Sequence, residues 1–169
     1  VAKDMAEYTG SVMFIDPSGR GADETAYAVV KMLNSQLFLT ACCGHTEGYS
    51  EKGMRQLVKV AKENKVNLIQ IESNFGDGMF QELLKPYLVE EYPCTIEEVR
   101  STKQKELRII DTLEPVMNQH RLIIDRKVIE EDVQSIQKYP EERASQYLLG
   151  YQLTRITKER GALTHDDRL

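Results

Sequence analysis

The chain has few of the residues that mark disulfide-rich, zinc-binding or membrane proteins. Its 169 residues include no tryptophan and three cysteines, of which Cys42 and Cys43 are adjacent and Cys94 stands alone. An odd number of cysteines without a C-x-x-C pair argues against a disulfide scaffold and a zinc ribbon, and it favours a reducing compartment. No stretch approaches the roughly 20 apolar residues of a membrane helix, and residues 1–10 do not resemble a secretion signal.

Several motifs of nucleotide and metal chemistry are missing as well. The sequence has no G-x-x-x-x-G-K-[ST], which excludes a Walker loop, and the Gly-Arg-Gly of residues 19–21 lacks the full dinucleotide fingerprint. No H-E-x-x-H pattern occurs among the three histidines, which are His45, His120 and His165. No serine or cysteine lies in a recognisable nucleophile motif. Acidic side chains are therefore the main candidates for chemistry.

The chain is acidic overall, but the acidic excess lies in its first half. With 22 Lys and Arg against 27 Asp and Glu, the formal net charge is −5. Residues 1–99 hold 9 basic and 15 acidic side chains, whereas residues 100–169 hold 13 and 12. Residues 100–127 alone hold seven basic and four acidic side chains, a balance that suits contact with phosphates even in an acidic protein. A solvated helix face with ion pairs is the alternative.

The hydrophobic pattern predicts one domain in which strands and helices alternate. Strands are expected at residues 11–16, 25–33, 36–43, 66–72, 94–99 and 121–125. Helices are expected at residues 50–65, 78–91, 104–119, 127–136 and 141–159. The second and third strands form a hairpin, which a purely parallel sheet does not contain. The order therefore predicts an α/β fold of the ribonuclease H-like class, with a mixed β-sheet flanked by helices on both faces.

The clearest of the predicted helices spans residues 104–119. Leu107, Ile110, Leu113 and Met117 recur three or four residues apart, as expected for one apolar face of a helix.

Acidic side chains lie at the ends of two predicted strands and at the start of a last predicted element. Asp16 ends the first strand, Glu72 ends the fourth, and Asp166 and Asp167 follow His165 at the start of a last element. If the first and fourth strands are parallel neighbours, their acids lie at the same edge of the sheet. Clustered carboxylates repel one another unless a cation neutralises them, and hard oxygen ligands select Mg²⁺ or Mn²⁺ over zinc. Two such ions can support cleavage of a phosphodiester.

Each acid also has a purely structural interpretation. Asp16 begins the turn sequence Asp-Pro-Ser-Gly, and Glu72 lies just before a region that can cap a helix. Thr164 and Asp167 fit a capping box, with Thr164 as the N-cap. Only the three acids together, in this order, carry the hypothesis of a metal site.

Four segments of the chain form a recognisable pattern. They are residues 16–25 (DPSGRGADET), 72–80 (ESNFGDGMF), 105–117 (KELRIIDTLEPVM) and 153–169 (LTRITKERGALTHDDRL). Over essentially its whole length the chain resembles the nuclease domain of bacteriophage terminase large subunits, most closely those of short-tailed phages. The resemblance implies a ribonuclease H/resolvase/integrase-like fold. It also implies an endonuclease with two ions, Mg²⁺ or Mn²⁺, that cuts concatemeric double-stranded DNA at the start and end of packaging.

The resemblance further implies roles for individual residues. Asp16 and Glu72 match the first two metal ligands of the family, with Asp16 bridging both ions. Asp166, Asp167 or both match the third ligand, with Asp166 preferred, and His165 would orient a phosphate or a water molecule. The basic residues implied at the DNA backbone are Lys103, Lys105, Arg108, Arg155, Lys158 and Arg160.

The resemblance also implies a piece of a larger protein. We expect residues 1–169 to be a single nuclease domain from which the packaging ATPase domain is absent, because no Walker loop is present. The partners expected for the intact protein are double-stranded DNA, the ATPase domain, the portal and the small terminase subunit, in the host cytoplasm and without a membrane. The family continues into a helix beyond Asp166, so we expect the third acid to be poorly fixed here and activity to be low.

Two other hypotheses remain open from the sequence. The first is another ribonuclease H-like nuclease, such as a Holliday junction resolvase, a ribonuclease H or a proofreading exonuclease, although residues 16–18 lack the D-x-E pair of the exonuclease. The second is an inactive docking module that binds the portal or the small terminase subunit. In that module the acids would cap helices and bind no divalent metal.

Overall fold

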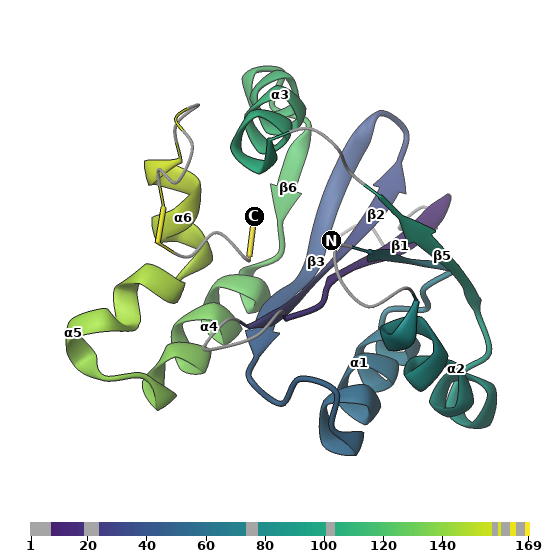
Figure 1. Cartoon of the computed structure of the whole chain (residues 1–169). Coiled ribbons are helices and arrows are strands. Elements are labelled where there is room, and N and C mark those ends of the chain that lie inside the picture. Colours follow the sequence, from purple (N-terminus) through teal and green to yellow (C-terminus); the bar gives the residue numbers. More distant parts are fainter. Residues whose placement is uncertain are drawn as a thin grey trace.

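A six-stranded mixed sheet crosses the molecule and carries helices on both faces (Figure 1). The computed structural model describes residues 8–18, 24–73, 78–100, 104–156, 159, 163–164 and 168–169. The strands are β1 (Gly10–Asp16), β2 (Thr25–Leu33), β3 (Gln36–His45), β4 (Leu68–Glu72), β5 (Thr95–Val99) and β6 (Leu122–Ile124). The helices are α1 (Glu51–Glu63), α2 (Met79–Glu91), α3 (Lys105–Asn118), α4 (Arg126–Ser135), η1 (Ile136–Lys138), α5 (Glu141–Ala144), η2 (Ser145–Tyr147) and α6 (Leu149–Arg155).

The sheet combines an antiparallel meander with parallel additions at both of its sides. Its strand order is β5-β4-β1-β2-β3-β6. β1, β2 and β3 pair antiparallel, whereas β4 runs parallel to β1, β5 parallel to β4 and β6 parallel to β3. The hairpin turn between β2 and β3 contains Asn34 at φ 55°, a left-handed conformation that asparagine tolerates well. The predicted mixed sheet and its hairpin are therefore confirmed.

The first crossover helix, α1, has the signals that its sequence predicts. The side chain of Ser50 caps the helix and accepts a hydrogen bond from the Gly53 N–H at 3.1 Å. Glu51 in the first turn and Lys62 in the last turn match the helix dipole. Its buried face consists of Gly53, Met54, Leu57, Val58 and Ala61.

The two faces of the sheet are covered unequally. The larger core lies between one face and the pair α1 and α2, where Met13 and Ile15 of β1 are buried. The opposite face has a smaller buried cluster, which consists of Leu39, Cys42, Val128 and Leu149. Phe14 alternates with Met13 and Ile15, and its side chain remains 44% exposed on this second face. The thin cover leaves room for a pocket on the second face.

The adjacent cysteines are core residues, as their strand position predicts. Cys42 and Cys43 are both buried, on opposite faces of β3. Burial raises the pKa of the Cys42 thiol to about 12. Among the described residues, no helix is both long and apolar enough to cross a membrane.

The single helix predicted for residues 141–159 is wrong. The chain instead forms α5, η2 and α6, and Leu148 between the last two is extended, with φ −71° and ψ 131°. The carboxylate of Asp132 on α4 accepts the N–H of Leu149 at 2.9 and 3.0 Å. That N–H would otherwise serve a continuous helix, so a contact from a distant element restarts the helix at Leu149.

Two adjacent leucines of α2 provide a matched test of this core. Leu84 is fully buried, whereas Leu83 is 41% exposed. We expect Leu84→Ala to lower the free energy of unfolding by about 2–5 kcal/mol, because it removes buried methyl groups and leaves a cavity. Leu83→Ala should cost less than about 1 kcal/mol in the same urea titration. Equal losses for the two variants would contradict the assignment of the core.

Candidate active site

The two strand acids lie side by side on one face of the sheet. Asp16 ends β1 and Glu72 ends β4. These strands are parallel neighbours, and Ile15 pairs with Ile71 in their register, so the acids that follow are adjacent. The predicted meeting of Asp16 and Glu72 at one sheet edge is therefore confirmed.

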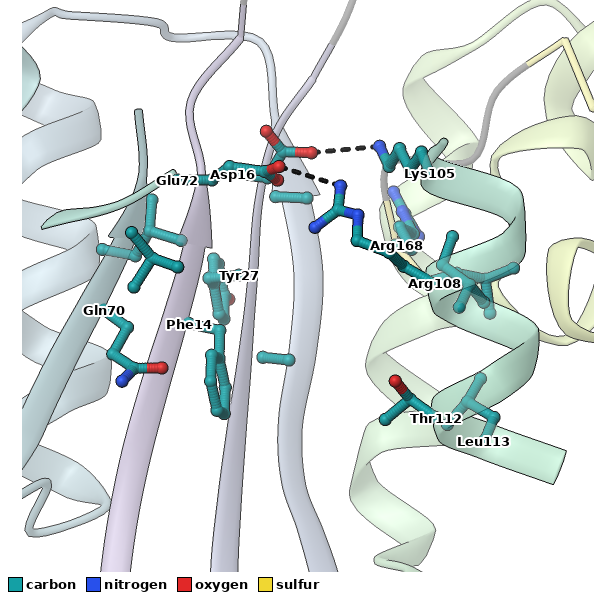
Figure 2. Close-up of a pocket in the computed structure, with 16 residues that line it drawn as sticks. Phe14, Asp16, Tyr27, Gln70, Glu72, Lys105, Arg108, Thr112, Leu113 and Arg168 are labelled. Carbon is teal, nitrogen blue, oxygen red and sulfur yellow. Dashed lines mark hydrogen bonds and ion pairs between the residues drawn. The ribbon is translucent and has the colours of Figure 1, made fainter. Parts of the chain in front are cut away.

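A pocket of about 380 Å³ opens beside these acids. Its floor comes from the ends of β1, β2 and β4, and α3 forms the facing wall (Figure 2). The apolar part of the lining includes Phe14, Val99, Ile109 and Leu113. The polar end of the pocket holds the two acids together with basic side chains.

Two basic side chains of α3 reach across the pocket to the acids. Lys105 Nζ lies 3.1 Å from Asp16 Oδ2, and Arg108 Nη2 lies 2.9 Å from Glu72 Oε1 (Figure 2). Lys105 and Arg108 are three residues apart and so share a helix face. All four side chains are partly exposed, between 17% and 31%. The site therefore pairs each acid with a cation that remains accessible to solvent.

The guanidinium of Arg108 has a hydrogen-bonding capacity that the described residues do not fill. Its Nε is buried and has no hydrogen-bond partner among them. A buried donor without an acceptor costs about 1–3 kcal/mol. Arg108 lines the pocket, and a planar guanidinium suits an anionic ligand such as a phosphate.

The apolar face predicted for α3 is only partly correct. Leu113 lines the pocket as expected, but Met117 is 43% exposed. The side of α3 that faces the acids carries Lys105 and Arg108, and Glu106 is the one side chain of this helix that is buried. The same side of α3 also presents Ile109 and Leu113 to the pocket, so this face of the helix is mixed rather than apolar.

The remaining predicted site residues are distributed as follows. Arg155 lies on α6, where its guanidinium carbon is 4.8 Å from the centre of the Tyr151 ring, and it does not line the pocket. The residues that lie outside the described part of the chain are Lys103, Lys158, Arg160, His165, Asp166 and Asp167. Within the described part, no group of three or more His, Cys, Asp or Glu side chains forms a metal site. Asp16 and Glu72 are the two predicted metal ligands that can be placed.

One residue of the site, Arg168, was not predicted from the sequence. Arg168, near the last described residue, lines the same pocket, and its side chain is fully buried. Its guanidinium contacts Glu24, immediately before β2, and Asp132 on α4. No local pattern reveals this cluster, because the partners of Arg168 are 144 and 36 residues away. A basic residue directly after the predicted third acid was the one available signal.

Known proteins resemble the chain in both sequence and structure. The family model "Terminase Bacteriophage T7, Ribonuclease H-like domain" matches residues 15–122. The chain belongs to this terminase family. It is 46% identical over 168 residues to the large terminase subunit of Enterobacteria phage T3, a match that covers 99% of the chain and 29% of that protein. The chain thus spans less than a third of this relative.

Solved terminase nuclease domains share the fold. A manganese-soaked, inhibitor-bound terminase nuclease domain from human cytomegalovirus matches with a TM-score of 0.62 and 13% identity, over 95% of this chain and 78% of that one. The nuclease domain of the large terminase subunit gp2 from bacterial virus Sf6 matches with a TM-score of 0.58 and 11% identity, over 91% and 74%. The predicted ribonuclease H-like fold is confirmed by this likeness and by the mixed sheet.

Proposed function

We propose that this terminase domain is an endodeoxyribonuclease that depends on Mg²⁺ or Mn²⁺ and hydrolyses phosphodiester bonds of concatemeric double-stranded DNA. The observation that carries the proposal is the adjacency of Asp16 and Glu72 at the ends of β1 and β4. Two carboxylates at one sheet edge, open to a pocket, are suited to cation binding and phosphoryl chemistry. The manganese-soaked relative supports the choice of ion.

The side chains at this edge fit a hard divalent cation. Asp16 and Glu72 offer carboxylate oxygens, the ligands that Mg²⁺ and Mn²⁺ prefer, and both remain partly exposed. Asp166 or Asp167 would complete the set, as the resemblance implies. When bound, two ions would supply the positive charge that favours attack by water and departure of the 3′ oxygen.

Lys105 and Arg108 would bind the DNA backbone in this proposal. In the described structure they neutralise Asp16 and Glu72. When cations occupy the acids, the two side chains become available to the DNA backbone. Arg108 is the stronger candidate, because its Nε lacks an acceptor and its planar guanidinium can bind phosphate in a bidentate manner. Both residues would then orient the phosphodiester over the acids.

The wider assignment follows the resemblance. We propose that residues 1–169 form one nuclease domain of a larger terminase. The ATPase domain, the portal and the small terminase subunit would be its partners in the host cytoplasm. Lys103, Arg155, Lys158 and Arg160 remain candidates for further backbone contacts, and His165 for orienting a phosphate or a water molecule. The net charge of −5 predicts weak, salt-sensitive DNA binding by the domain alone.

The first test removes the acid charges without changing side-chain shape. Asp16→Asn and Glu72→Gln should each lower the rate of plasmid cleavage in Mn²⁺ by at least about 100-fold, because cation charge stabilisation contributes several kcal/mol. Glu90→Gln is the matched control, since Glu90 is an exposed residue of α2 and does not line the pocket.

The control should cut like the wild type. Undiminished cleavage by Asp16→Asn or Glu72→Gln would overturn the site. If the wild type neither binds Mn²⁺ in calorimetry nor cleaves DNA, the protein is a docking module instead. Preference for branched DNA or for an RNA–DNA hybrid in a substrate panel would indicate a resolvase or a ribonuclease H.

The second test addresses Arg108. In Ca²⁺, a hard cation that carboxylates bind and that we expect not to support cleavage, Arg108→Ala should weaken binding of a double-stranded oligonucleotide and reduce the slope of log K against log salt by about one. Arg143→Ala, on the exposed face of α5, removes the same charge outside the pocket. Fluorescence anisotropy across a salt series measures both. Equal slopes for the two variants would contradict a phosphate contact by Arg108.

A further inference from the structure

Lys31 and Lys65 approach the first residues of β3 from two different elements. Lys31 of β2 pairs with Phe38 in the register of the sheet, so these two side chains lie on the same face. Lys65 directly follows Asn64, the residue that ends α1, and Asn64 Oδ1 accepts a hydrogen bond from Thr40 Oγ1 at 3.0 Å. Lys65 is exposed, whereas Lys31 is half-buried. The backbones of both lysines are therefore fixed beside the same part of β3.

Lys127 reaches this part of β3 from α4. The N–H of Asp125 donates to the Leu39 carbonyl at 3.0 Å, and Asp125 Oδ1 accepts the N–H of Lys127 at 3.0 Å. The side chain of Lys127 is exposed. Partial burial and then the positive charges of Lys127 and Lys65 lower the pKa of Lys31, as expected for ammonium groups that lie near one another. Three like charges thus converge on one short stretch of strand.

These three lysines differ from several others in their lack of acidic partners. Within the described part of the chain, no ion pair is formed by Lys31, Lys65 or Lys127. By contrast, three lysines of α1 and α2 lie 2.8–3.8 Å from glutamates, and these are Lys52, Lys59 and Lys85. Like charges repel one another, so an anion bound beside the first three lysines would relieve their repulsion.

An aromatic side chain lies among the three lysines. Lys31 Nζ is 5.0 Å from the centre of the Tyr8 ring, and that ring meets the Phe38 ring edge-on, with the ring centres 5.3 Å apart. Tyr8 remains 38% exposed. We call Tyr8, Lys31, Lys65 and Lys127 the lysine patch. Lysine and tyrosine side chains both donate to the phosphate and sugar oxygens of DNA, so this combination favours a nucleic acid over an acidic peptide, which would need only the cations.

The lysine patch is separate from the candidate active site. None of its members lines the pocket that holds Asp16 and Glu72. Val30 packs in the cluster on the pocket side of the sheet, and side chains alternate along a strand, so Lys31 is directed to the other side. Lys31 also pairs with Ser11, which precedes Asp16 on β1 by about 17 Å at about 3.3 Å per residue. A phosphate in the pocket and a phosphate at the patch therefore belong to different stretches of DNA.

We propose that the lysine patch binds the phosphate backbone of double-stranded DNA, at a stretch other than the one that enters the pocket. Each lysine would neutralise one phosphate, and Tyr8 would donate to a neighbouring phosphate or sugar oxygen. A second contact of this kind would offset the repulsion between DNA and a chain of net charge −5. The choice of DNA rests on the proposed function, in which DNA is the polyanion that this domain cuts.

The test compares two triple variants that change the net charge equally. The patch variant carries Lys31→Gln, Lys65→Gln and Lys127→Gln. The control variant carries Lys52→Gln, Lys59→Gln and Lys85→Gln. Fluorescence anisotropy is recorded in Ca²⁺ across a salt series, with a duplex of about 40 base pairs, which at about 3.4 Å per base pair is long enough to reach both the pocket and the patch. The patch variant should bind more weakly, with a slope of log K against log salt reduced by about two to three, and the control slope should change by less than about one.

Two further measurements keep the result interpretable. Tyr8→Ala should weaken binding and leave the slope unchanged, because it removes a contact that carries no charge. Circular dichroism checks the fold of the patch variant. If that variant does not fold, the single changes Lys65→Gln and Lys127→Gln, both at exposed positions, should each reduce the slope by about one.

Equal slopes for the patch and control variants would overturn the proposal. Loss of polyglutamate binding in the patch variant, with unchanged duplex binding, would also overturn it and assign this surface to an acidic protein. In either case, plasmid cleavage by the wild type in Mn²⁺ would leave the proposed function intact. A slope that depends on the patch, in a wild type that neither binds Mn²⁺ nor cleaves DNA, would instead refute the proposed function and retain the DNA contact.

Discussion

The parallel pairing of β1 with β4 is the constraint on which the site depends. It places the ends of two strands, 56 residues apart in sequence, at one edge of the sheet, and both strands end in an acid. Two adjacent carboxylates repel each other, so the fold must supply positive charge nearby. In the described structure that charge comes from Lys105 and Arg108 of α3, and in the proposed reaction it comes from divalent cations.

The acids lie on the more thinly covered face of the sheet. The face covered by α1 and α2 has a large apolar core, whereas α3 buries only Glu106 and leaves a pocket in front of the acids. The ion pairs of Lys105 and Arg108 are partly exposed, so these side chains can exchange their partners for phosphate without loss of a hydrophobic core.

Much of the site could be predicted because its acids are local signals: each ends an apolar strand. The order of elements likewise predicted the mixed sheet. The failures share a cause, which is contact between residues distant in sequence. The Asp132 carboxylate accepts the N–H of Leu149, where a new helix begins, and so divides the predicted helix. The partners of Arg168 lie 144 and 36 residues away from it in sequence.

The central claim is that Asp16 and Glu72 bind a divalent cation together. The most direct measurement is the anomalous difference density of a crystal soaked in Mn²⁺ and recorded at the manganese absorption edge. The account predicts a peak within about 2.5 Å of carboxylate oxygens from both residues, with Lys105 and Arg108 displaced from their present partners. A well-diffracting soaked crystal without a peak at these acids, and with both ion pairs intact, would contradict it.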